Sequence, residues 1–213
     1  MAIELAAFHD LVSIEELRRE LPRQAGLPGI HQLTRAIGLA DENTASPQEP
    51  LMKLCWMLDA GLPRPLSNVP VFTRAGKHLA TPDLLDPVAG VVGEYDGAVH
   101  LHQRKRDRDR EETLRAVGLE YFTVLAGDLG RRPVVERMRA ARARARFEDP
   151  ATRAWTLEAP YWWIPTETVA QRRALDEFDR RRLLIPRVPG ESVNVTPPAL
   201  RTRHDSWGGA TSS

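Results

Sequence analysis

Apolar residues recur at helical spacing over the first sixty residues, and shorter β-prone runs come after them. Ser13 and Glu16 form a capping box that predicts a helix ending near Leu21. A second helix is expected over about 29–39, because its apolar residues fall on one side. Residues 1–45 are too few to bury much apolar surface alone, so we expect this region to pack on the next part of the chain.

A third helix is predicted to begin at Ser46. Serine is a favourable N-cap residue, and Glu49 would complete a second capping box. Leu51, Leu54, Cys55 and Leu58 recur at helical spacing and define the face that we expect to be buried. Gly61 is the expected end of this helix.

The segment after this helix predicts an α/β domain. Four β-prone runs cover about 69–72, 78–84, 90–95 and 119–125. A helix over 107–117 separates the last two runs, and a strongly basic helix over 133–147 comes after them. This order favours a compact α/β domain with its core at roughly 46–130.

The last third of the chain has weaker patterns. Residues 160–163 read Pro-Tyr-Trp-Trp, which is typical of a packing element, and a charged helix is predicted over 166–184. From Pro186 the chain is rich in Pro, Gly, Ser and Thr, as in flexible tails. We therefore divide the chain into a helical N-terminal region (1–45), an α/β domain (46–147), a helical extension (148–185) and a flexible tail (186–213).

Composition narrows the class of protein. The chain has 213 residues, of which 42% are hydrophobic and 28% charged, as in globular proteins. A single cysteine, Cys55, excludes a disulfide framework and a cysteine-rich zinc site. No apolar run has the ~20 residues of a membrane helix, and the first twelve residues carry no basic residue, unlike a signal peptide. We expect no membrane partner and a cytoplasmic location. The formal net charge is only +1, but basic residues cluster at 104–110, 131–146 and 180–182, which leaves a nucleic-acid partner open.

Three carboxylates are candidates for chemistry: Asp83, Glu94 and Asp96. Residues two apart on a strand share a face, so Glu94 and Asp96 would project together, and a paired strand would bring Asp83 beside them. Clustered carboxylates repel one another, and a hard cation such as Mg²⁺ or Mn²⁺ relieves the repulsion. Such a cation beside the basic run of Arg104, Lys105 and Arg106 suits cleavage of a phosphodiester bond.

Structural roles explain the same residues. Asp96-Gly97 is also a turn signal, and Glu49 is explained as a capping residue. Asp83 after a proline suits a loop, and His100 suits the surface. The arginines of 131–146 fit a solvated helix face.

Several short motifs occur in a fixed order, and together they carry a family resemblance. They are Ser46-x-x-Glu49, Ala60-Gly61-Leu62-Pro63, Asn68-Val69-Pro70, Pro82-Asp83-Leu84, Glu94-Tyr95-Asp96-Gly97-x-x-His100 and Arg106-Asp107-x-x-Arg110-x-x-x-Leu114-x-x-x-Gly118. Over about 46–130 the chain resembles the actinobacterial branch of an endonuclease-like family of unknown function. That family is related to the very-short-patch (Vsr) repair endonucleases of the PD-(D/E)XK superfamily. The resemblance implies a core with a four-stranded mixed sheet flanked by helices, and Mg²⁺ as cofactor.

The resemblance also implies roles for individual residues. Asp83 and Glu94 would be metal ligands, and Asp96 stands where the superfamily usually has a lysine. His100 would transfer protons, as its ordinary pKa near 6.5 permits. Glu49 matches a helix acid that lies near the metal in related nucleases. Arg110 matches a polar position of the following helix, with phosphate or a carboxylate as its partner.

Two main functions remain open at this point, and a third, weaker possibility is a structural or interaction protein whose arginine-rich helix and tail bind a partner. The first is a metal-dependent DNA endonuclease, acting as a monomer or a homodimer in DNA repair, phage defence or a mobile element. The second is an inactive nuclease fold that binds nucleic acid, as in a regulator or an antitoxin-like protein. The absent lysine, and Thr123 where the last strand often carries arginine, fit the second; the joint presence of Asp83, Glu94 and His100 favours the first.

Overall fold

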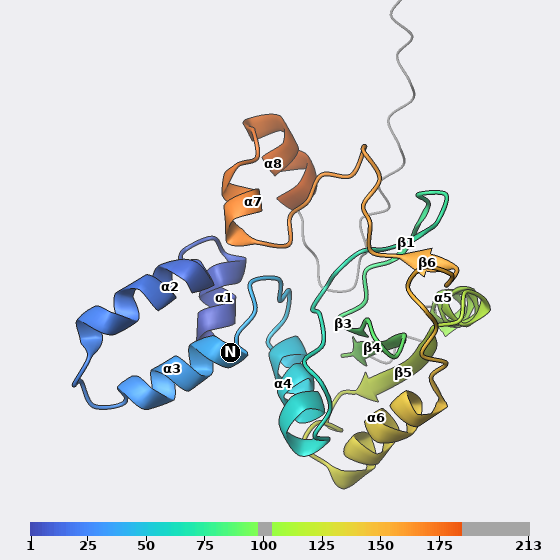
Figure 1. Ribbon diagram of the computed structural model, residues 1–213, viewed down its shortest axis with the longest axis horizontal. Helices are drawn as coiled ribbons and strands as arrows, with labels where there is room; N and C mark the ends of the chain where they lie inside the picture. The colour runs from blue at the N-terminus through green and yellow to red at the C-terminus, as the bar shows by residue number, and fades with distance from the viewer. Residues whose placement is uncertain (98–103, 185–213) are drawn as a thin grey trace, which may run out of the picture.

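The computed structural model describes residues 1–97 and 104–184, with the side chains of 104–107 excepted. Within these ranges the chain is a mixed α/β protein with eight α-helices and two three-stranded sheets. Figure 1 shows the sheets and their helices on one side of the molecule and the N-terminal helices on the other. No helix in the described part of the chain is long and apolar enough to cross a membrane.

One sheet contains β3 (Leu84–Asp86), β4 (Val91–Asp96) and β5 (Glu120–Leu125), in that order. β3 and β4 are antiparallel. β4 and β5 run parallel, and α5 (Arg104–Ala116) lies between them in the sequence. Parallel neighbours need such a crossover, whereas an antiparallel pair closes through a short turn.

The other sheet contains β2 (His78–Ala80), β1 (Val71–Thr73) and β6 (Trp155–Thr156). The predicted four-stranded sheet is therefore wrong for the described residues. The run over 78–84 was expected to be one strand, but it splits at Pro82, which has no amide proton for a ladder. On the outer edge of β3, Leu66 forms a bridge with Leu85 through two hydrogen bonds of 2.8 Å. Neither β1 nor β2 pairs with β3.

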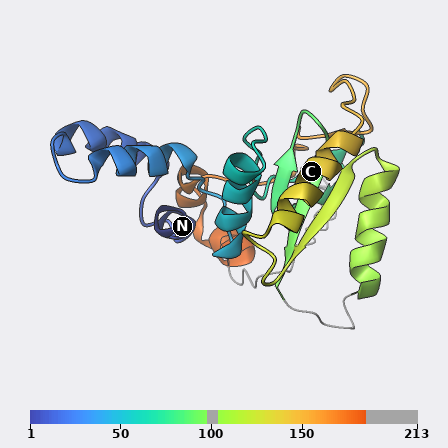
Figure 2. The same cartoon turned by 90° about the horizontal axis from the view of Figure 1, so that it is seen from below.

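Two apolar clusters hold the α/β part together. The first joins α4 (Gln48–Leu54), the π-helical turn η2 (Cys55–Asp59) and α6 (Arg132–Arg144) to one face of β3-β4-β5. The second joins the other face to α5 and to the β2-β1-β6 sheet. Figure 2 shows the N-terminal helices, α4, the strands and α5 following one another across the molecule.

Two expectations for the helix after Ser46 are wrong. The residue that precedes α4 is Pro47, and no side chain caps the helix, because Glu49 accepts a hydrogen bond from the Ala45 amide instead. Leu51 and Leu58 are exposed. Cys55, which belongs to the expected face, is buried as predicted, and Met52 and Trp56 enter the core beside it, where Trp56 stacks on Phe122 at 5.7 Å.

The N-terminal region is helical as predicted. It contains α1 (Ala2–Phe8), α2 (Ile14–Glu20), a 3-10 turn (Leu21–Gln24) and α3 (Ile30–Leu39). The capping box of Ser13 and Glu16 is confirmed: the Glu16 amide donates to Ser13 Oγ at 3.0 Å and the Ser13 amide donates to Glu16 Oε2 at 2.6 Å.

The single helix predicted over 166–184 is wrong, because α7 (Val169–Arg173) and α8 (Glu177–Leu184) are separate. In Figure 1 both lie beside the N-terminal helices. Arg172 of α7 makes this contact: it is 1% exposed, and its guanidinium donates to Asp10 Oδ1 at 2.7 Å and to the Ala7 carbonyl at 2.7 Å. The tail expected over 186–213 lies outside the described residues.

Candidate functional site

Asp83 comes just before β3, beside the part of β4 that carries Glu94. Leu84 pairs with Gly93, so the next position along the antiparallel register sets Asp83 against Glu94. The Tyr95 amide donates to Asp83 Oδ2 at 2.7 Å, which holds the Asp83 carboxylate at this end of β4. Two of the predicted residues are therefore neighbours in the fold.

Arg110 of α5 reaches the same end of β4. Its Nη2 lies 2.8 Å from Glu94 Oε1 and 3.5 Å from the Thr81 carbonyl oxygen. Of the two partners left open for Arg110, phosphate or a carboxylate, the structure places a carboxylate beside it. The ion pair holds the Arg110 guanidinium at the end of β4.

Glu49 approaches from the first turn of α4. Its side chain is buried, and Oε2 accepts hydrogen bonds from the Ala45 amide at 2.8 Å and from Asn68 Nδ2 at 2.6 Å. Burial first, and then the charge of Asp83, raise the pKa of Glu49 to about 7, while the Asn68 hydrogen bond opposes the shift. A carboxyl with this pKa exchanges its proton near neutral pH.

The pKa of Asp83 is raised as well. Burial is the main cause, and the hydrogen bond from Tyr95 and the charge of Arg110 act against it. Asp83 and Glu49 are thus two desolvated carboxyls that sense each other's charge. Such a pair is stabilised by a shared proton or by a bound cation.

The other predicted residues are less well defined. Asp96 ends β4, two positions after Glu94 and so on the same face, and the Ala126 amide donates to its carbonyl at 3.0 Å. His100 lies outside the described residues. Arg104, Lys105 and Arg106 begin α5, but their side chains are not among those described.

Two residues near Glu94 were not predicted from the sequence. Tyr121 lies on β5, and burial followed by the charge of Glu94 raises its pKa to about 12. His78 of β2 lies close enough to Arg110 for that charge, after burial, to lower the pKa of the imidazole. Neither residue belongs to a motif whose spacing would indicate a functional site. Each is brought to the site by the pairing of its strand with another strand.

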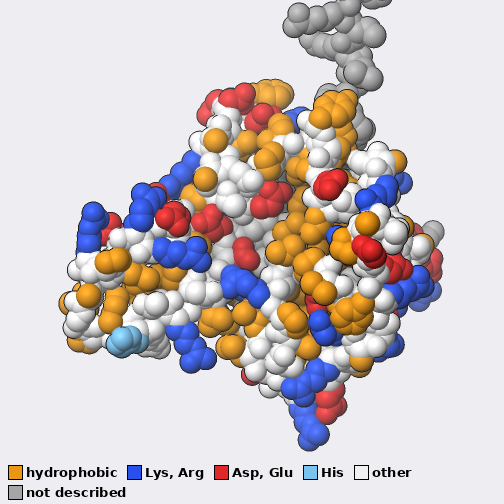
Figure 3. Space-filling model, viewed as in Figure 1, with side chains coloured by type: hydrophobic (Ala, Val, Ile, Leu, Met, Phe, Trp, Pro, Cys, Tyr) orange, Lys and Arg blue, Asp and Glu red, His pale blue; other side chains and the backbone are white. Residues whose placement is uncertain are grey.

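The basic helix α6 is bound to the rest of the fold rather than free. Arg139 donates to the Ala60 and Asp59 carbonyls at 3.0 and 3.1 Å. Other arginines in or beside the helix are ion-paired: Arg132 with Glu136, Arg137 with Asp128, Arg142 with Asp86, Arg144 with Glu120 and Arg146 with Glu148. On the face in Figure 3, basic and acidic side chains are interspersed. The cluster over 131–146 is therefore largely compensated.

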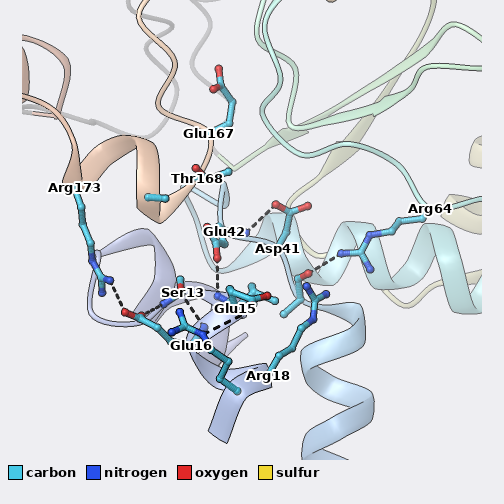
Figure 4. Close-up of a pocket in the computed structure, with 14 residues that line it drawn as sticks. Ser13, Glu15, Glu16, Arg18, Asp41, Glu42, Arg64, Glu167, Thr168 and Arg173 are labelled. Carbon is cyan, nitrogen blue, oxygen red and sulfur yellow. Dashed lines mark hydrogen bonds and ion pairs between the residues drawn. The ribbon is translucent and has the colours of Figure 1, made fainter. Parts of the chain in front are cut away.

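A cavity of about 560 Å³ lies elsewhere, between α2, α7 and the segment that follows α3. Figure 4 shows that charges of both signs line it. Glu42 fixes its walls, because Oε1 accepts from the Ile14 amide at 2.6 Å and Oε2 from the Val169 amide at 2.7 Å. None of the described candidate residues lines this cavity, so we do not count it as part of the candidate site.

The chemistry of the carboxylates fits a hard divalent cation. Mg²⁺ is commonly held by one or two carboxylates, with water and substrate phosphate oxygens completing its shell. Among the described residues, no three His, Cys, Asp or Glu side chains are arranged to hold a metal ion by themselves. Asp83 and Glu94 would therefore form a two-carboxylate site of the kind that a substrate completes.

Comparisons of the chain with protein families, with curated proteins and with solved structures gave no significant match. The resemblance to the Vsr-related endonuclease family stays a prediction, which rests on the motifs in the sequence.

Proposed function

We propose that this protein is a metal-dependent DNA endonuclease that hydrolyses phosphodiester bonds in the cytoplasm. The observation that supports the proposal is that the Tyr95 amide holds the Asp83 carboxylate beside the part of β4 that carries Glu94, with buried Glu49 near enough to interact with the charge of Asp83. We further propose that β3, β4, α5 and β5 form a PD-(D/E)XK-type arrangement. Its role would be in DNA repair, phage defence or a mobile element.

The residues divide the chemistry between them. Asp83 and Glu94 would hold Mg²⁺ or Mn²⁺, and the bound cation would supply a Lewis acid for the phosphoryl group. Glu49, with a pKa of about 7, would accept or release a proton near neutral pH. Asp96, on the Glu94 face of β4, would orient water.

Basic residues would bind the DNA backbone. The Arg110 guanidinium, which pairs with Glu94 at 2.8 Å, would turn its fork to a phosphate when DNA binds. Arg104, Lys105 and Arg106 begin the same helix and would extend the phosphate contacts. His100 stays a predicted proton-transfer residue.

A plasmid-cleavage assay tests this proposal. Wild-type protein should nick or linearise supercoiled DNA in Mg²⁺ or Mn²⁺ and not in EDTA. Asp83→Asn and Glu94→Gln should lose this activity while keeping the wild-type circular-dichroism spectrum and a cooperative urea transition. Glu112→Gln is the matched control, because Glu112 is an exposed acid on α5 and lies outside the proposed machinery. Equal cutting by all four proteins would contradict the site assignment.

A second function has one observation in its favour. The Glu94 carboxylate is already paired with Arg110, and in the described part of the chain no three metal-binding side chains converge. A nucleic-acid-binding regulator, or an antitoxin-like protein, would use the same arginines without turnover. Salt-dependent DNA binding by a wild-type protein that cuts no DNA with either cation would favour this function.

A further inference from the structure

A histidine outside the carboxylate cluster is connected to it through one threonine. His78 Nε2 lies 2.9 Å from Thr81 Oγ1. The carbonyl oxygen of the same threonine lies 3.5 Å from Arg110 Nη2, and that nitrogen lies 2.8 Å from Glu94. Thr81 therefore joins His78 to the guanidinium that pairs with Glu94.

The C-terminal extension holds the histidine ring in place. The Trp163 indole stacks on the His78 imidazole with 5.1 Å between ring centroids and 27° between planes. Phe72 of β1 packs edge-on against both rings, at 5.6 Å from His78 and 5.0 Å from Trp163. β6 pairs with β1, which brings the extension to this place. The ring is thus positioned by two segments that lie far apart in the sequence.

Burial and the nearby positive charge favour the neutral form of His78. Burial lowers its pKa below the ordinary value of 6.5, the positive charge of Arg110 lowers it further, and a hydrogen bond with the Ala80 backbone acts in the opposite direction. A neutral imidazole does not repel Arg110 and does not compete with it for Glu94. Its interaction with Thr81 is that of a hydrogen-bonding group alone.

We propose that His78 is a positioning residue of the candidate site: held by Trp163, it fixes Thr81 so that the Thr81 carbonyl and Glu94 together orient Arg110. This inference rests on the proposed endonuclease function and deepens it, because Arg110 is the group assigned to the scissile region of the DNA backbone. It also gives the segment that follows β6 a role in the site.

The test uses three variants of the full chain and one control. His78→Ala removes the hydrogen bond and the stacked ring. Thr81→Val cuts the link while leaving the ring, and His78→Gln restores a nitrogen with similar reach to Nε2. His31→Ala is the matched control, because His31 is an exposed histidine on α3.

The first measurement does not depend on activity. The side-chain ¹⁵N–¹H signals of Arg110, assigned by their loss in Arg110→Lys, report how firmly the guanidinium is held. We expect them to shift or broaden in His78→Ala and in Thr81→Val, to return toward the wild-type positions in His78→Gln, and to stay unchanged in His31→Ala.

The second measurement is DNA cleavage. Partners that orient a functional group from outside typically contribute roughly tenfold or more to activity. We therefore expect kcat/KM to fall about tenfold in His78→Ala and Thr81→Val, and to recover in His78→Gln. Loss through misfolding would not be rescued by glutamine and would not occur in Thr81→Val.

The outcomes separate the two proposals. Wild-type Arg110 signals and a wild-type kcat/KM in both His78→Ala and Thr81→Val would overturn the positioning role and leave the endonuclease standing. A wild-type protein that cuts no DNA would contradict the proposed endonuclease function. In that case the Arg110 signals alone would decide whether His78 orients Arg110.

Discussion

Arg110 Nη2 lies 2.8 Å from Glu94 Oε1, so an ion pair joins α5 to the end of β4. The two side chains are 29% and 16% exposed, and such a partly buried pair is screened less by salt than a surface pair. The guanidinium therefore occupies the carboxylate that we assign to cation binding. In the proposed function, the cation at Glu94 and the phosphate at Arg110 would each compete with this ion pair.

Replacing Arg110 should strengthen the binding of Mg²⁺ and weaken the binding of DNA. In Arg110→Gln the Glu94 carboxylate loses its cationic partner, so Mg²⁺ should bind the free protein more tightly, as measured by titration calorimetry. DNA should bind more weakly, and the slope of log K against log salt should fall by about one unit. Arg108→Gln, an exposed arginine on the same helix, is the control for net charge. An unchanged Mg²⁺ affinity in Arg110→Gln would show that the ion pair does not limit cation binding.

Glu49→Gln should alter the pH dependence of stability. Burial, and then Asp83, raise the pKa of Glu49 from 4.5 to about 7, so the folded protein binds this proton more tightly than the unfolded chain does. The contribution of this group to stability is greatest below pH 4.5 and falls as the pH rises toward 7. Glutamine has no such proton and keeps an oxygen that can accept from Ala45 and Asn68.

We expect Glu49→Gln to match wild type near pH 4 and to exceed it by about 3 kcal/mol above pH 7. Urea unfolding in EDTA across this range measures the difference. A gap between the two proteins that is the same at every pH would mean that the pKa of Glu49 is not raised in the folded state.

Gly93→Ala should destabilise the β3-β4-β5 sheet. A Cβ at this position would lie 2.4 Å from the Phe122 ring, which is itself stacked on Trp56, so the ring has nowhere to move. Overpacking of this kind costs about 1–3 kcal/mol of unfolding free energy. Gly38→Ala is the control, because a Cβ there meets nothing within 4 Å and lies on α3, where alanine is the better helix former by roughly 0.5 kcal/mol or more. The two substitutions should move the urea midpoint in opposite directions.

Arg172→Met should weaken the contact between α7 and the N-terminal helices. The substitution leaves Asp10 without its main partner and removes the donors to the Ala7 and Glu42 carbonyls. Breaking a buried ion pair from one side costs about 3 kcal/mol or more. The result should be a lower urea midpoint and faster proteolysis of the segment that carries α7 and α8.

The matched control is Arg181→Ala on α8. Arg181 pairs with Glu177, one turn earlier on the same helix, and both side chains are exposed. Loss of this ion pair should lower the unfolding free energy by less than about 0.5 kcal/mol. Equal unfolding free energies for Arg172→Met and wild type would show that α7 contributes nothing to the stability of the N-terminal region.

The two predicted capping boxes show where the sequence alone was sufficient to predict local structure. Ser13 and Glu16 are three residues apart, and Arg173 pairs with Glu16 through Oε1, which leaves Oε2 to the Ser13 amide, so the local pattern decided the outcome. Ser46 and Glu49 have the same spacing. There, Asn68 donates to Glu49 from nineteen residues away, and the local box does not form. A local rule fails where a distant residue offers a better hydrogen bond.

The candidate site divides in the same way. Alternation along a strand was enough to set Glu94 and Asp96 on one face of β4, whereas the approach of Asp83 depended on the pairing of β3 with β4. His78 and Tyr121 could not be found in that way, because each reaches the site through a strand that pairs with another part of the chain. The number of strands in each sheet was also beyond the sequence, since it depends on whether β2 continues past Pro82.

The sequence by itself determined the mixed α/β character of the chain, the positions of most helices and strands and the capping box at Ser13, because hydrophobic period and capping residues act within a few residues. Only the tertiary structure decided that β2 and β3 belong to different sheets and that Arg110 pairs with Glu94. The burial of Glu49 near Asp83 and the contact of Arg172 with α1 are also visible only in the tertiary structure. These are contacts between segments far apart in the chain, and their energies come from burial and from charges that desolvation strengthens.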